Sequence, residues 1–86
     1  MENKVLIKLI IPELDDSYDL FIPVSESIFS IKKLIIKLFG DILNNGMVNN
    51  NFVLMNKYTS RVYKNNEFVI DTDIRNATEL LLIACN

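Results

Sequence analysis

The chain has 86 residues, half of them hydrophobic, with a formal net charge of −2 and no histidine. This apolar content is enough for one core and argues against disorder, so we expect residues 1–86 to form a single domain. The slight negative charge provides no field that attracts nucleic acid or anionic membranes. Without histidine there is no Ser-His or Cys-His catalytic pair, and we expect no enzyme activity.

The first predicted elements are two strands joined by a short turn. Residues 4–11 present apolar side chains along one face, and Pro12 ends this strand because proline has no N–H for a sheet ladder. Residues 13–17 have turn composition, and residues 18–24 alternate as a second strand, with Pro23 near its end. The short connection predicts an antiparallel hairpin.

The one predicted helix covers residues 27–43, with Ser27 as its N-cap. Its apolar sector is about 200° wide, whereas a surface helix usually has about 100° or a little more. Two hypotheses account for the extra flank: the following loop covers it through Met47 and Val48, or the flank contacts a partner. The residues that define the central stripe recur at spacings of three and four: Ile28, Ile31, Ile35, Leu38 and Ile42.

Short strands and turns follow the helix. Strands are predicted at residues 52–56, 62–63 and 79–84. Residues 68–70 are expected to be extended, and residues 71–73 to form a single helical turn. The order strand, strand, helix, strand, short strand, strand indicates an α+β fold, in which a mixed sheet of four to five strands packs on one helix.

Two stretches resemble the ubiquitin-like β-grasp family. Residues 18–24, with Ser27, Ile28 and Ile31, are similar to its second strand and helix entry, and residues 61–66 and 73–83 are similar to its C-terminal half. In detail, YDLFIPVSESI–SIKKLI and KNNEFVIDTDIRNATELLLI resemble the YukD/EsaB ubiquitin-like proteins of Gram-positive type VII (ESX/Wss) secretion systems. The resemblance implies a bacterial accessory protein in the cytoplasm, recruited to the inner face of the membrane by cytoplasmic or membrane components of the secretion machine.

The end of the chain differs from that of ubiquitin itself. Ubiquitin-type modifiers and sulfur carriers use a flexible Gly-Gly tail, whereas this chain stops at Ala84-Cys85-Asn86. We therefore expect neither conjugation nor thiocarboxylate chemistry. Cys85 is the only cysteine, so no intrachain disulfide forms, which fits a reducing cytoplasm.

The candidate chemical sites favour ordinary structural roles. Glu67, Asp71 and Asp73 could suggest a cation site, but Arg75 occupies the position where a calcium loop needs an oxygen ligand. Turn-forming or capping carboxylates are favoured instead. We therefore expect no catalytic, metal or cofactor site.

The basic residues of the helix and the apolar run at the start of the chain also favour ordinary structural roles. Lys32, Lys33 and Lys37 give the helix a basic side, but no aromatic residues are interleaved to form a nucleic-acid groove, so we expect a solvated face. The apolar run of residues 4–11 is too short for a signal peptide or a membrane span, so direct membrane insertion is not expected.

The last strand suggests a binding surface. Residues 80–83 are apolar at every position, whereas a half-exposed antiparallel strand alternates between apolar and polar side chains. If Leu80 and Leu82 pack on the helix, Leu81 and Ile83 face away from it.

The third strand poses the same choice. We expect Val53 and Met55 to point inward, which sends Phe52 and Leu54 outward. The resemblance places the third and last strands side by side, at the surface where ubiquitin-like domains commonly engage partners. The predicted protein-binding patch therefore consists of Phe52, Leu54, Leu81 and Ile83.

The leading hypothesis is a non-covalent binding module that uses this patch, with self-association through the patch or the helix flank as a second hypothesis. The alternative for the patch is a strand that is apolar for β-propensity alone or is covered by the C-terminus. An adaptor of an unrelated bacterial complex is the alternative function, and a covalent modifier, a sulfur carrier and an enzyme are disfavoured.

Overall fold

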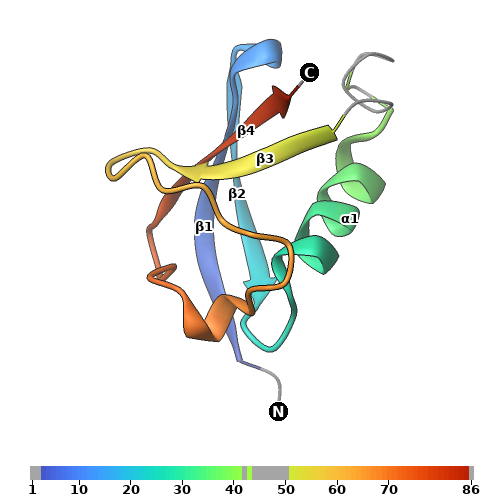
Figure 1. Cartoon of the computed structure of the whole chain (residues 1–86). Coiled ribbons are helices and arrows are strands. Elements are labelled where there is room, and N and C mark those ends of the chain that lie inside the picture. Colours follow the sequence, from blue (N-terminus) through green and yellow to red (C-terminus); the bar gives the residue numbers. More distant parts are fainter. Residues whose placement is uncertain (1–2, 42, 44–50, 86) are drawn as a thin grey trace.

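The fold is a four-stranded sheet with one helix on one face, seen in a computed structural model that describes residues 3–41, 43 and 51–85 (Figure 1). The sheet order is β2-β1-β4-β3; β1 and β4 are parallel, and the other pairs are antiparallel. This arrangement confirms the predicted α+β fold. The elements are β1 (Lys4–Ile11), β2 (Asp16–Pro23), α1 (Ile28–Phe39), β3 (Asn51–Asn56) and β4 (Glu79–Cys85), with short 3-10 helices at Pro12–Leu14 and Val69–Asp71.

The turn between β1 and β2 determines the residue at which β2 begins. Asp15 lies in the left-handed region (φ 52°), and its N–H donates to the Pro12 carbonyl at 3.0 Å. This reversal brings Asp16 opposite Ile11, so β2 begins two residues before the predicted start at residue 18. Aspartate tolerates this backbone conformation better than most residues.

Helix α1 has the predicted N-cap and a shorter C-terminal end than predicted. The Ser30 N–H donates to the Ser27 hydroxyl oxygen at 3.2 Å, which confirms the cap. The helix ends at Phe39 rather than at residue 43, next to Gly40, a residue with low helix propensity. Leu43 is nevertheless buried, and its N–H donates to the Phe39 carbonyl.

The predicted cover of the helix flank by Met47 and Val48 lies outside the described residues. Within them, part of the flank is covered: Ile36 and Phe39 pack partly against the core, whereas Phe29 is 52% exposed. The core therefore covers only part of the wide apolar sector of α1.

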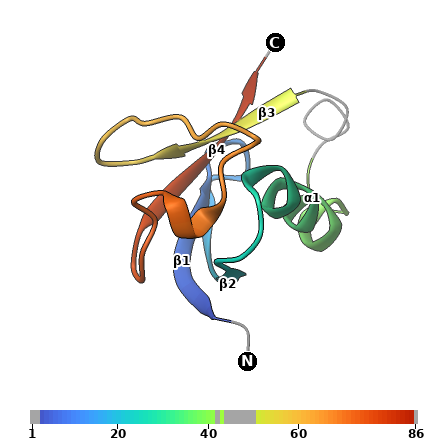
Figure 2. The same cartoon turned by 60° about the horizontal axis from the view of Figure 1, so that its bottom comes forward.

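The segment between β3 and β4 closes one end of the sheet and meets the start of α1 (Figure 2). The Ile28 N–H donates to the Glu67 carbonyl at 2.8 Å, next to a bridge between Ser27 and Phe68. The predicted strand at residues 62–63 is reduced to a single bridge between Met55 and Val62.

The helical turn in this segment comes two residues earlier than predicted. Residues 68–70 were expected to be extended, but Val69–Asp71 forms a 3-10 helix. Its end is closed by Thr72, whose N–H and hydroxyl both donate to the Val69 carbonyl. The turn buries Val69 completely in the core.

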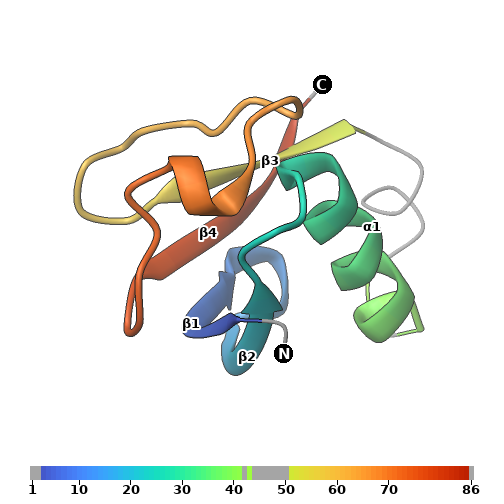
Figure 3. The ribbon, with the colours of Figure 1, turned by 90° about the horizontal axis from the view of Figure 1, so that it is seen from below.

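The core lies between α1 and the face of the sheet that the helix covers (Figure 3). Every strand contributes alternate residues to this inner face. The strand and helix side chains that are at most 1% exposed are Ile7, Leu9, Ile11, Ile22, Ile28, Ile31, Ile35, Leu54, Leu80 and Leu82.

Candidate functional site

The structure corrects the predicted orientation of β3. Leu54 is completely buried and stands opposite Leu82 on the inner face, so its predicted outward orientation is wrong. Phe52, two residues earlier on the same side, packs partly against the core. These two members of the predicted patch therefore belong to the inner face of the sheet.

The orientation of β3 is set by Asn56 at its end. Four consecutive apolar residues precede Asn56, so hydrophobicity alone does not select a face. Asn56 is buried because its side chain bonds the turn that follows: its oxygen accepts from the N–H groups of Tyr58 and Thr59, and its amide donates to the Tyr63 hydroxyl. A strand that ends in a turn-forming Asn is the sequence signal that would have identified this orientation.

The open face of the sheet carries a different set of apolar residues, which we call the outer patch. Leu81 and Ile83 lie on this face as predicted, opposite Met55 and Val53 of β3. All four are partly exposed. Ile10 of β1 stands next to Leu81, and Val62 is bridged to Met55. The outer patch thus consists of Ile10, Val53, Met55, Val62, Leu81 and Ile83.

A charged row borders the outer patch. Lys8 of β1 lies between Asp19 of β2 and Glu79 of β4, with all three on the open face. Lys57 joins this row through an ion pair with Glu79 at 3.4 Å. The row separates the outer patch from a second apolar pair on the same face, Leu6 opposite Phe21.

Tyr58 completes this border. Its hydroxyl donates to the Glu79 carboxylate, which lowers the pKa of Glu79 and raises the pKa of Tyr58. Glu79 therefore stays ionised at neutral pH beside two lysines. The outer patch is thus an apolar surface with a mixed-charge rim, the usual composition of a protein interface.

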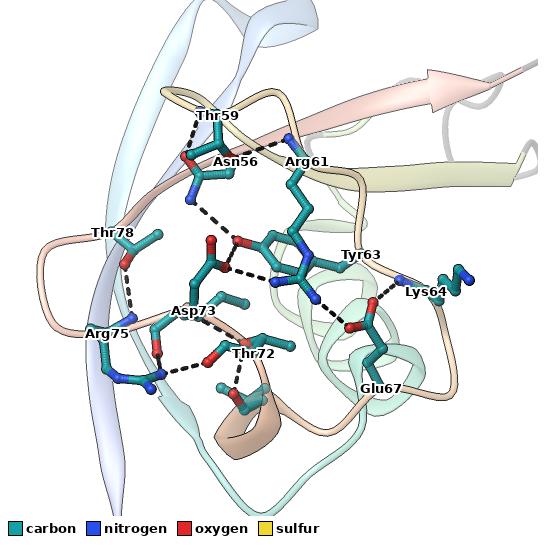
Figure 4. A network of polar contacts seen from close by, with 12 residues as sticks. Asn56, Thr59, Arg61, Tyr63, Lys64, Glu67, Thr72, Asp73, Arg75 and Thr78 are labelled. Atoms are coloured by element: carbon teal, nitrogen blue, oxygen red, sulfur yellow. Dashed lines mark hydrogen bonds and ion pairs between the residues drawn. The ribbon is translucent and has the colours of Figure 1, made fainter.

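A polar network at the edge of the core has a structural role (Figure 4). The Tyr63 hydroxyl donates to Asp73, and the Arg61 guanidinium contacts both Asp73 (3.5 Å) and Glu67 (2.6 Å). Burial, followed by the bond to Asp73, raises the pKa of Tyr63 to about 12, so Tyr63 remains a hydrogen-bond donor at neutral pH.

The acidic residues predicted to cap turns have structural roles here. Glu67 accepts from the Lys64 N–H at 2.7 Å, and Asp71 lies in the 3-10 helix. In the described part of the chain, no group of three His, Cys, Asp or Glu side chains is placed to hold a metal ion. Among the same residues, no helix is long and apolar enough to cross a bilayer.

Comparison with known proteins identifies the fold. No family model and no curated protein matches the sequence. The chain is similar to the N-terminal ubiquitin-like domain of the 4931431F19Rik protein (14% identity, 100% of this chain and 79% of that chain, TM-score 0.75). It is also similar to a ubiquitin-like domain from Arabidopsis thaliana (12% identity, 95% and 78%, TM-score 0.72).

A third similar structure is a chain of an enzyme complex. A chain of the toluene 4-monooxygenase HD complex superimposes with a TM-score of 0.78 at 2% identity, over 96% of this chain and 100% of that chain. At these identities the comparisons establish the ubiquitin-like β-grasp fold. The fold alone does not determine the function, because one fold can carry unrelated sites.

Proposed function

We propose that this protein is a non-covalent, ubiquitin-like accessory protein of a bacterial type VII secretion system, and that the outer patch binds its partner subunits. The observation that carries the proposal is the apolar open face of the sheet. A half-exposed antiparallel sheet normally alternates apolar-in and polar-out, whereas β3 and β4 are apolar on both faces. A contiguous exposed apolar surface usually marks an interaction site.

The secretion-system assignment rests on the sequence. The resemblance to YukD/EsaB proteins covers residues 18–35 and 64–83, and these segments form most of β2, most of α1, the chain leading into β4 and most of β4. Under this proposal the protein acts in the cytoplasm and is recruited to the membrane by cytoplasmic or membrane components of the machine. Self-association through the outer patch is the competing use of the same surface.

Isothermal titration against the purified cytoplasmic domains of the secretion machine tests the proposal. The test variant is the double substitution Met55→Asp and Leu81→Asp, which places two charges in the outer patch. The control is Ile70→Asp, which introduces the same charged side chain at a residue that is 60% exposed in the 3-10 helix Val69–Asp71, outside the outer patch. We expect the test variant to bind at least about tenfold more weakly than the wild type and the control to bind as the wild type does.

Two results would contradict the proposal. Equal affinity of all three proteins would exclude the outer patch, and wild-type protein that binds no component would exclude the secretion machine. Circular dichroism confirms that each variant is folded.

An adaptor of an unrelated bacterial complex is the second candidate, because the same fold with the same apolar open face can serve another assembly. Gene neighbourhood separates the two candidates. Genes for small WXG-type substrates and a secretion ATPase beside this gene support the secretion machine, and genes for another multisubunit complex support the adaptor.

A further inference from the structure

We propose that a pocket on the open face of the sheet binds an arginine side chain of a partner protein, whose guanidinium pairs with Asp19 and stacks on the Phe21 ring. We call it the Phe21 pocket. It lies on the other side of the charged row from the outer patch, so it does not depend on the function proposed above. Its lining includes Leu6, Lys8, Asp19, Phe21, Ala77 and Glu79.

The first observation is the exposed apolar wall of the Phe21 pocket. Phe21 is 61% exposed and stands opposite Leu6, which is 37% exposed. The space beside them has a volume of about 630 Å³, enough to take a long side chain. An aromatic ring exposed to this degree gains favourable free energy when a partner covers it.

The second observation is that the turn at Asn76 and Ala77 is fixed against β1. The Leu6 N–H donates to the Asn76 side-chain oxygen at 2.8 Å, and the Leu6 carbonyl accepts from the Ala77 N–H at 2.7 Å. These bonds hold Ala77 in the left-handed region (φ 73°), which residues with a side chain rarely adopt. The wall is therefore in place without a partner, and binding does not require the turn to be ordered.

The third observation is an unmatched carboxylate. Lys8 stands opposite Asp19, where a cross-strand ion pair is expected. In the described part of the chain, however, neither an ion pair nor a hydrogen bond joins the Asp19 carboxylate to another residue. The Glu79 carboxylate, in contrast, accepts from the Tyr58 hydroxyl and pairs with Lys57. The negative charge that a ligand can neutralise at this pocket is therefore that of Asp19.

The chemistry of Asp19 and Phe21 together favours a guanidinium. The two residues lie on the same face of β2, about 7 Å apart along the strand, which is within reach of one arginine side chain. A guanidinium is planar, stacks on an aromatic ring and donates hydrogen bonds to a carboxylate, whereas an ammonium is more strongly hydrated. We therefore expect the pocket to prefer arginine to lysine.

The chain's own arginines argue against a second copy as the occupant. The sequence contains two, Arg61 and Arg75. Arg61 is paired with two carboxylates, and Arg75 donates to the carbonyls of Thr72 and Ile74. A second copy would have to break these contacts before it could offer a guanidinium, so the pocket fits a different protein with an exposed arginine.

The test uses the synthetic peptide acetyl-GLRLG-amide, titrated into the isotope-labelled full chain and followed by NMR. Two matched peptides replace the arginine with citrulline, which has the same shape without the charge, or with lysine. We expect the arginine peptide at millimolar concentration to shift the amide signals of Asp19 and Phe21 and the methyl signals of Leu6 and Ala77. We expect the other two peptides to bind at least about threefold more weakly.

Two variants separate local pairing from the general charge of the protein. Asp19→Asn removes the unmatched carboxylate, and its matched control, Asp41→Asn, makes the same change at another exposed residue, just after α1. We expect Asp19→Asn to bind the arginine peptide at least about threefold more weakly than the wild type, and Asp41→Asn to bind it as the wild type does. Circular dichroism confirms that both variants are folded.

A third variant tests the stacking. Phe21→Leu keeps an apolar side chain but removes the ring, so it should weaken binding of the arginine peptide more than binding of the citrulline peptide.

Four results would overturn the proposal: no saturable shifts at millimolar peptide, shifts confined to the outer patch, equal binding of the arginine and citrulline peptides, or equal effects of Asp19→Asn and Asp41→Asn. Equal binding of the lysine peptide would contradict the preference for a guanidinium.

Discussion

The two faces of the sheet are both apolar, yet they have different surroundings. On the inner face, Leu54, Leu80 and Leu82 are completely buried beneath α1, whereas their neighbours Met55 and Leu81 on the open face are partly exposed. The comparison shows that hydrophobicity along β3 and β4 does not determine which side is core. Contacts with other elements determine it: α1 covers one face, and the turn bonded by Asn56 fixes which residues of β3 point to that face.

Leu80 and Leu81 are adjacent and point to opposite faces, so they provide the sharpest stability comparison. Leu80→Ala should lower the free energy of unfolding by about 2–5 kcal/mol, because it opens a cavity in a closed core. Leu81→Ala should lower it by less than about 1 kcal/mol, because the site is open to solvent. Urea unfolding of both variants measures the difference, and equal losses would contradict the division between the faces.

Two tyrosines extend the comparison to hydrogen bonds. Tyr63→Phe removes a buried hydroxyl that donates to Asp73 and accepts from Asn56, and it should cost about 1–2 kcal/mol. Tyr58→Phe also removes a hydroxyl that donates to a carboxylate, but at the exposed rim of the open face, so the loss of stability should be clearly smaller than for Tyr63→Phe. A larger loss for Tyr58→Phe in urea unfolding would contradict this assignment.

Substitution of Glu67 should have the smallest of these effects on stability, and this effect depends on pH. The Lys64 N–H, followed by Arg61, lowers the pKa of Glu67 below its ordinary value of 4.5. A carboxyl with a lowered pKa in the folded state stabilises the fold above its ordinary value and loses that contribution as pH falls through the lowered value.

Glu67→Gln should therefore have a lower Tm than the wild type at neutral pH, and the difference should disappear as the pH falls below 4.5. Thermal unfolding followed by circular dichroism across this range measures the difference. A difference that persists unchanged in acid would show that the ionised carboxylate is not its source.

Much of the fold follows from local patterns in the sequence. The three-four spacing around Ile31 and Ile35 predicted α1, and Pro12 marked the end of β1 at the residue where the structure ends it. These predictions are correct because the spacing of apolar residues along a helix and the effect of proline on a strand each depend on a single element. The end of α1 was predicted too late because Ile42 and Leu43 continue the apolar pattern of the sequence beyond Phe39, the last residue of the helix.

The candidate site was predicted only in part, because its geometry depends on contacts between elements. Leu81 and Ile83 were placed correctly, since the neighbouring Leu80 and Leu82 complete the core. On β3 the deciding residue is Asn56, whose partner Tyr63 lies seven residues further along the chain. The position of Ile10 beside Leu81 likewise depends on the strand order, which the hydrophobic pattern does not contain.

The most direct test of the two-face description compares Leu54→Asp with Met55→Asp, two adjacent substitutions of identical chemistry. We expect Leu54→Asp to unfold the domain, because it places a carboxylate in a closed apolar core. We expect Met55→Asp to retain the wild-type circular dichroism spectrum and a cooperative thermal transition. A folded Leu54→Asp beside an unfolded Met55→Asp would show that β3 is turned the other way and that the outer patch is part of the core.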